Sequence, residues 1–182
     1  YMASVWDSVV GQGRAVEQLQ HAAISPVHAY LLVGTEGCGK DEASRAFAAM
    51  LLSSSDDPTE RINEMAMRGA HPDIHEVRRE GASILKDQAE DIIKIASITP
   101  SESSRKVIIV HEVHLMAPAT AAMLLKTVEE PPSGVFFIML ADQVDDSLAT
   151  IASRCFTVHF GLLENADIEQ ALINSGVAPT LA

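Results

Sequence analysis

The sequence predicts an α/β fold in which helices cover both faces of a five-stranded parallel sheet. Strand and helix patterns alternate along the chain, and the strands expected at residues 107–110 and 135–140 are apolar throughout. Strands buried on both faces have this pattern, and parallel sheets are covered by helices on both sides. A chain of 182 residues with 47% hydrophobic content is long enough for one well-buried core and a small appendage.

The individual elements follow in order from local patterns. Short apolar runs predict the strands, which we expect at residues 29–33, 73–77, 107–110, 135–140 and 156–160. Apolar residues at helical spacing predict the helices, several of which start or end at Pro or Gly. We expect helices at residues 13–25, 41–52 and 59–68, from Leu85 to before Pro100, from Pro118 to before Pro131, at 147–153 and at 165–175.

Composition limits the classes of function. The formal net charge of −12 argues against a surface wrapped broadly in nucleic acid, although it allows a few local phosphate contacts. Cys38 and Cys155 lie far apart and offer no disulfide framework, which suits a reducing compartment. The chain has no signal peptide pattern and no apolar run near the roughly 20 residues of a membrane span. We therefore expect a soluble cytoplasmic protein with no membrane partner.

A phosphate-binding loop, complete except at its last position, follows the first expected strand. It reads Gly34-Thr35-Glu36-Gly37-Cys38-Gly39-Lys40-Asp41. Its glycines let backbone N–H groups turn toward phosphate oxygens, and the next helix adds its positive end. A Ser or Thr normally follows the lysine and gives a hydroxyl to Mg²⁺, whereas this chain has Asp41.

The carboxylate of Asp41 would lie beside the β- and γ-phosphates. Like charges 4 Å apart cost about 4 kcal/mol at an effective dielectric near 20. A carboxylate can also ligate Mg²⁺, but its longer reach would displace the ion. The alternative is that Asp41 caps the helix and offsets its dipole while no phosphate is bound. This alternative, with weak or absent binding of ATP or ADP, is the one we expect.

The exit of the strand at residues 107–110 is the second chemical landmark. In phosphate-loop ATPases this strand delivers an Asp to the Mg²⁺ shell, and His111 stands at that position here. Neutral imidazole is a poor ligand for Mg²⁺, which prefers oxygen. Both metal-holding positions are therefore altered, which predicts a degenerate site without a metal ion.

Several further motifs are similar to those of one protein family. They are Val10-Gly11-Gln12, His28-Ala29-Tyr30-Leu31, His71-Pro72-Asp73, the run Leu124-Leu125-Lys126-Thr127-Val128-Glu129-Glu130-Pro131-Pro132, and Ser153-Arg154-Cys155. In combination they resemble bacterial clamp-loader subunits of the AAA+ class, most of all the delta prime subunit of DNA polymerase III. The resemblance covers nearly the whole chain. It implies an AAA+ P-loop NTPase fold for residues 1–160 and the beginning of a helical lid domain at 161–182, so we expect a piece of a longer protein.

The resemblance also implies roles for single residues. Arg154 would reach across a subunit interface to the ATP of a neighbour; the alternative is an exposed Arg that complements a helix C-terminus. Glu112 occupies the position that polarises water in active relatives and would be vestigial here. Val10 and Gln12 would lie near an adenine, or else form only a turn before a helix. The phosphate contacts, vestigial or not, would come from Gly34, Gly37, Cys38, Gly39, Lys40 and Asp41.

Departures from the family pattern also bear on function. Residues 51–72 contain no cysteine, so we expect no structural zinc, and Ala141-Asp142 stands where a Thr or Asn usually senses the γ-phosphate. We expect a subunit without ATPase activity of its own, working with gamma or tau, delta, the sliding clamp and primed DNA. One alternative is an ATP-hydrolysing motor subunit like gamma or tau. Another, weaker alternative is a metal-dependent hydrolase built on the pairs His71/His75 and His111/His114, which we expect to be ordinary loop or surface histidines.

Overall fold

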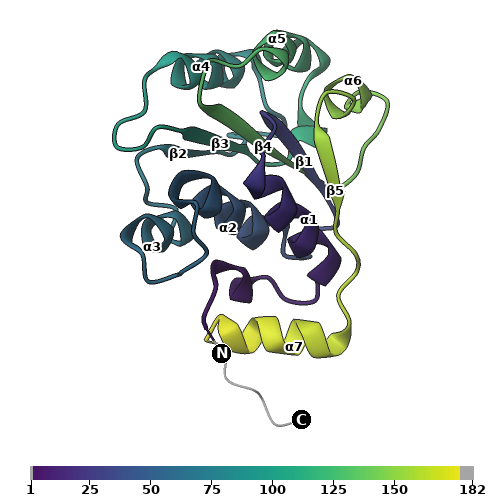
Figure 1. Cartoon of the computed structure of the whole chain (residues 1–182). Helices are drawn as coiled ribbons and strands as arrows, with labels where there is room; N and C mark the ends of the chain where they lie inside the picture. Colours follow the sequence, from purple (N-terminus) through teal and green to yellow (C-terminus); the bar gives the residue numbers. More distant parts are fainter. Residues whose placement is uncertain (1, 177–182) are drawn as a thin grey trace.

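All five predicted strands form one parallel sheet in the computed structural model, which describes residues 2–176 (Figure 1). The strands run in the order β2-β3-β4-β1-β5. Their bounds are Ala29–Val33 for β1, Ile74–Val77 for β2, Lys106–Val110 for β3, Val135–Ala141 for β4 and Phe156–His159 for β5. Because every neighbouring pair is parallel, the carboxyl ends of all strands lie at the same edge of the sheet.

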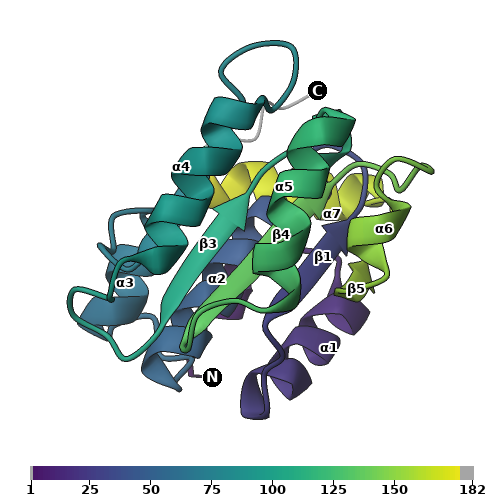
Figure 2. The same ribbon diagram turned by 90° about the horizontal axis from the view of Figure 1, so that it is seen from above.

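Helices cover both faces of the sheet, as the sequence predicts (Figures 1 and 2). One face carries α1 (Gly13–Ile24), α2 (Lys40–Ser53) and α3 (Arg61–Met67). The other carries α4 (Lys86–Ser97), α5 (Pro118–Glu129) and α6 (Ala149–Ala152). Successive strand side chains point to opposite faces, so Tyr30 and Leu32 belong to the core under α1 and α2, while Leu31 packs in the core under α4 and α5.

Two helices begin two residues later than predicted because side chains fold the chain locally before them. The helix expected at 59–68 is α3, since Asp57 accepts hydrogen bonds from the backbone N–H and the hydroxyl of Thr59 and forms a turn there. The helix expected at 147–153 shrinks to α6. Asp145 accepts from the Ser147 hydroxyl and from the backbone N–H of residue 148, so these residues form a turn before the helix. Such local side-chain bonds compete with helical backbone bonds.

The helix predicted at 165–175 is α7 (Asn165–Asn174), which lies beside the short helix η1 (Val5–Ser8), on the side of the molecule away from α4 and α5 (Figure 1). Gly11 permits this approach, because a Cβ there would lie 2.7 Å from Cγ of Asp167. The division at residue 160 remains a prediction, and residues 177–182 of the expected lid lie outside the described part. Among residues 2–176, no helix is long and apolar enough to cross a membrane.

Candidate functional site: a phosphate loop with substituted metal positions

The phosphate loop connects β1 to α2, and its backbone requires the glycines that the sequence supplies. Gly37 and Gly39 have φ of 77° and 98°, in the region that side-chain-bearing residues rarely adopt. Gly34 has no room for a side chain, since a Cβ there would lie 2.7 Å from both Cys38 Sγ and Phe160 Cβ. Cys38 itself is buried, and burial raises the pKa of its thiol. The loop is therefore a tightly packed structural element.

Gln12 ties this loop to the segment that leads into α7. Its amide nitrogen donates to the backbone oxygens of Cys38 (3.0 Å) and Gly161 (2.8 Å), and its oxygen accepts from the N–H of Gly161 (3.0 Å). Val10 lines a cavity of about 250 Å³ together with Gly37, Gly39 and Leu163, whereas Gln12 is not among the lining residues. Of the two residues predicted to lie near an adenine, Val10 thus borders a cavity, whereas the side chain of Gln12 is hydrogen-bonded to backbone groups. The contact of either residue with a base stays a prediction.

Lys40, the loop lysine, is paired with a carboxylate of its own chain. Its side chain is only 8% exposed, and its ammonium lies 3.0 Å from Oδ1 of Asp142 and 3.3 Å from the carbonyl oxygen of Thr35. Asp142 directly follows β4. Its backbone N–H donates to Nδ1 of His114 (3.2 Å), and Nε2 of the same ring lies 3.6 Å from Oδ2 of Asp142.

Asp41 and His111, the residues at the two altered positions, lie near each other and near a third group on β2. Nδ1 of His111 lies 3.8 Å from Oδ2 of Asp41, and its Nε2 donates to Oε1 of Glu76 at 3.0 Å. Arg45 of α2 donates to both carboxylate oxygens of Glu76, while Arg78 lies 3.8 Å from each of Glu76 and Asp41. The hydrogen bond from His111, followed by that from Arg45, outweighs burial and lowers the pKa of Glu76 to about 2.

Asp41 does not cap α2, contrary to the expectation. The N-cap position is Gly39, with no side-chain cap, and Asp41 lies in the first turn of the helix. Gly39 takes the cap position because the loop needs its left-handed backbone there. In the first turn, the carboxylate still interacts favourably with the positive end of the helix.

A cavity of about 440 Å³ opens at this end of the sheet, above the loop. It is lined by Glu36, Gly37, Gly39, Lys40, Asp41, Glu42, Arg78, His111, Glu112, Leu140 and Asp142. Five of these residues are acidic, and only Lys40 and Arg78 carry a permanent positive charge. Lys40 is already paired with Asp142, and Arg78 lies 3.8 Å from Asp41. A polyanion entering this space would meet like charges at short range, which is unfavourable.

Glu112, the predicted vestigial residue, borders the same cavity but is engaged elsewhere. Its Oε2 accepts from Nε of Arg79 at 2.9 Å. Its backbone has φ of 54°, an uncommon left-handed conformation for a residue with a side chain. This kink turns the chain from β3 into the short helix η2 (Val113–Leu115) and brings His114 back toward Asp142.

Arg154 lies at the opposite end of the sheet from the loop. Arg154 lies two residues before β5, whereas the loop follows β1, and the two strands are parallel with Tyr30 opposite Phe156. Strands rise about 3.3 Å per residue, so more than roughly 10 Å of sheet separates the two sites. The side chain of Arg154 is 37% exposed, and its guanidinium pairs with Glu129 at the end of α5 and donates to the carbonyl oxygen of Thr150. Arg154 thus contacts the end of a helix, as the alternative interpretation of an exposed arginine at a helix C-terminus predicts. The fold does not bring it to the phosphate loop of its own chain.

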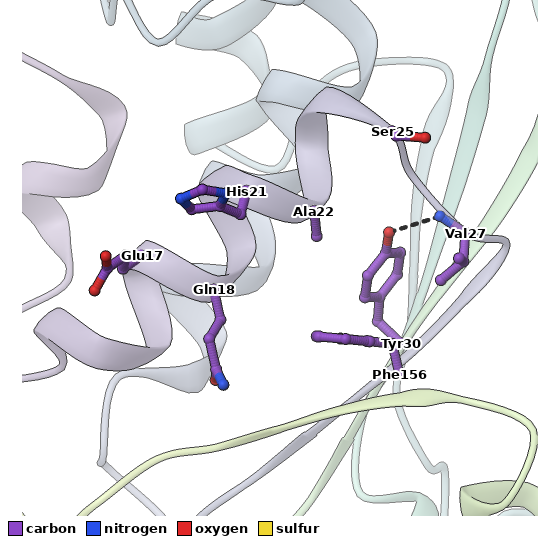
Figure 3. A pocket seen from close by; sticks show the side chains of 8 residues that line it. All are labelled: Glu17, Gln18, His21, Ala22, Ser25, Val27, Tyr30 and Phe156. Carbon is purple, nitrogen blue, oxygen red and sulfur yellow. Dashed lines mark hydrogen bonds between the residues drawn. The ribbon is translucent and has the colours of Figure 1, made fainter.

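A second cavity of about 440 Å³ lies at this amino end of the sheet, between α1 and β5 (Figure 3). The rings of Tyr30 and Phe156 lie on its strand side, and Glu17, Gln18 and His21 of α1 lie on the other. The Tyr30 hydroxyl accepts a hydrogen bond from the N–H of Val27, and burial raises the pKa of that hydroxyl. The two rings give this space an apolar wall, whereas the cavity at the phosphate loop is lined mostly by charged and polar residues.

Three of the four histidines of the hydrolase alternative have polar partners of their own. His71 accepts a hydrogen bond from the N–H of Asp73, while His111 bonds to Glu76 and His114 contacts Asp142. Within residues 2–176, no three His, Cys, Asp or Glu side chains are grouped so that they could hold a metal ion.

The family model described as "DNA polymerase III, delta subunit" matches residues 11–164, most of the chain. The chain belongs to the DNA polymerase III delta subunit family. Relatives include the DNA polymerase III subunit delta' of Bacillus subtilis (strain 168), 35% identical over 85% of this chain and 48% of the relative. The tau subunit of the same organism is 32% identical over 82% of this chain and 28% of its own length. The resemblance drawn from the motifs is confirmed, and this chain spans about half the length of the delta' relatives or less.

Solved structures confirm the predicted fold class for this DNA polymerase III family member. A DNA polymerase III gamma subunit-related protein from Thermotoga maritima has a TM-score of 0.62 and 21% identity over 84% of this chain and 47% of its own. A RuvB variant of the same organism has a TM-score of 0.60 and 16% identity over 92% of this chain and 51% of its own. At these identities the likeness concerns the fold, which is that of AAA+ proteins.

Sequence reasoning missed Glu76, Arg45 and Arg78 as members of the site. One signal was present, because Glu76 falls inside an expected strand, where a carboxylate needs a partner. Which partner it finds depends on β2 pairing with β3, in the register that sets Val77 opposite Val110. This register places Glu76 near His111, the residue after β3.

Proposed function

We propose that this chain is a delta prime-like clamp-loader subunit that hydrolyses no ATP itself and supplies Arg154 to the ATP site of a neighbouring subunit. Its partners would be gamma or tau and delta, and the assembly would load a sliding clamp on primed DNA in the cytoplasm. The family membership supports the complex, because relatives are named as delta', tau and gamma subunits of DNA polymerase III.

The position of Arg154 is the observation that carries the trans-acting role. An exposed guanidinium at the end of the sheet opposite its own phosphate loop can act only on a nucleotide held by another chain. A guanidinium supplied in trans stabilises charge on the transferred phosphoryl group and contributes about 10³- to 10⁵-fold to kcat in other phosphate-loop enzymes. Glu129, from the same run of residues that marks the family, holds Arg154 by an ion pair until the partner docks.

Three substitutions around one cavity support the proposal that the loop is inactive. Asp41 replaces the hydroxyl for Mg²⁺, His111 replaces the metal-binding Asp, and Asp142 replaces the residue that senses the γ-phosphate. His111 is already hydrogen-bonded to Glu76 and Lys40 is already paired, so neither group is available to a nucleotide without breaking a contact.

The experiment is to reconstitute the complex with gamma or tau and delta subunits and to measure its clamp- and DNA-stimulated ATPase rate. Arg154→Ala in this chain is expected to lower kcat at least about 100-fold. Lys40→Ala in this chain should leave kcat unchanged, and Arg68→Ala, which removes another exposed arginine, is the matched control. Loss of activity with Lys40→Ala but not with Arg154→Ala would establish the reverse roles.

A motor subunit like gamma or tau is the second candidate, favoured by the intact loop glycines and Lys40 and by the likeness to tau. Titration with ATP and Mg²⁺ by calorimetry separates the two candidates. Micromolar affinity together with turnover that Lys40→Ala abolishes would support the motor subunit; no heat of binding supports the trans-acting subunit.

A further inference from the structure

The ammonium of Lys40 needs an anionic partner wherever it stays folded into the loop. Its side chain is 8% exposed, so few water molecules can solvate its charge. A poorly hydrated charge without a partner is costly. In a nucleotide-bound phosphate loop, the β- and γ-phosphates are that partner. Here the partner is a carboxylate of the same chain, at 3.0 Å.

Asp142 is held in position to provide this carboxylate. The last hydrogen bond beside it, from the N–H of Gly34 to the carbonyl oxygen of Ala141, fixes the end of β4 against the start of the loop. The N–H of Asp142 donates to Nδ1 of His114, and the imidazole lies against the second carboxylate oxygen. Contacts on both sides therefore orient the carboxylate toward Lys40.

We propose that Asp142 is an internal anion that occupies Lys40 in place of a phosphate and thereby decides that the loop does not take up a triphosphate. This inference rests on the proposed function, since it names the residue that keeps the loop inactive. It also gives the carboxylate a second role, which is to keep the loop folded without a nucleotide. Asp41 and His111 remove the metal, whereas Asp142 competes with the phosphates themselves.

The test compares Asp142→Asn with Glu36→Gln in the purified protein. Both variants remove one negative charge from the same cavity, but the exposed Glu36 makes no contact with Lys40. Binding of inorganic pyrophosphate and of ATP without Mg²⁺ is measured by calorimetry. Asp142→Asn should bind at least roughly tenfold tighter than the unchanged protein, equivalent to about 1.4 kcal/mol, and Glu36→Gln should gain less than half of that factor. An equal gain in both variants, or no gain in Asp142→Asn, would overturn the proposal.

Thermal unfolding gives a second readout if Asp142→Asn is less stable. The variant leaves Lys40 without its anion, so its melting temperature should fall, and millimolar pyrophosphate should restore it while leaving the unchanged protein unaffected. A fall that pyrophosphate does not reverse would contradict the proposal. The outcome is separate from the proposed function, since the effect of Arg154→Ala on the complex does not depend on Asp142.

Discussion

The carboxylate of Glu76 has three positively charged or imidazole neighbours in the site, and replacing Glu76 with Gln should lower the free energy of unfolding measurably. The side chain is 16% exposed and is bonded to both His111 and Arg45. These bonds lower its pKa from 4.5 to about 2. At about 1.4 kcal/mol per pKa unit, the shift corresponds to roughly 3 kcal/mol. Because Gln keeps part of the hydrogen bonding, we expect Glu76→Gln to lose about 2 kcal/mol at pH 7.

The same shift fixes how stability depends on pH. Folding lowers the pKa of Glu76, so its contribution is complete above about pH 4.5 and is lost as the pH falls toward 2. The free energy of unfolding of the unchanged protein should therefore fall faster over this interval than that of Glu76→Gln. The two values should approach each other near pH 2.

Urea unfolding followed by circular dichroism at pH 7, 4.5 and 3 measures both effects. Glu80→Gln is the matched control, because Glu80 is exposed and lies four residues further along. If Glu76→Gln is as stable as Glu80→Gln at pH 7, or if both lose stability equally on acidification, the ion pairs of Glu76 do not stabilise the fold.

Three further outcomes follow from buried or partly buried polar groups. Asp73 accepts hydrogen bonds from three consecutive backbone N–H groups, which outweigh burial and lower its pKa. Asp73→Asn should therefore lower the free energy of unfolding in urea by about 2 kcal/mol, and a loss under about 0.5 kcal/mol would contradict this. Partial burial raises the pKa of the Cys155 thiol to about 12. Iodoacetamide at pH 8 should therefore label it at least about 100-fold more slowly in the native protein than in urea, and equal rates by mass spectrometry would contradict the raised pKa. Gln12→Ala should increase hydrogen exchange in both the phosphate loop and the segment before α7, whereas a change confined to residue 12 would show that the two are not linked.

Most of the fold could be predicted from the sequence because its signals are local. The apolar runs found all five strands, and the strand bounds differ from the prediction by one residue at most. The two helices that begin two residues later than predicted are those preceded by Asp57 and Asp145, whose side chains bond to nearby backbone groups. A helical pattern alone does not show whether such a residue will fold the chain into a turn instead.

The phosphate loop and its altered residues could likewise be found from the sequence, since the motif is a continuous stretch between a strand and a helix. The sequence alone therefore determined the family, the parallel sheet and the loss of the usual groups at Asp41 and His111. Only the tertiary structure decided which partners the side chains of the loop and of His111 have. The partners of His111 and Lys40 come from β2 and from the end of β4, 35 and 102 residues away along the chain. Strand order and register bring these distant carboxylates to the loop, and a charge in a poorly hydrated site pairs with whichever opposite charge the fold places beside it.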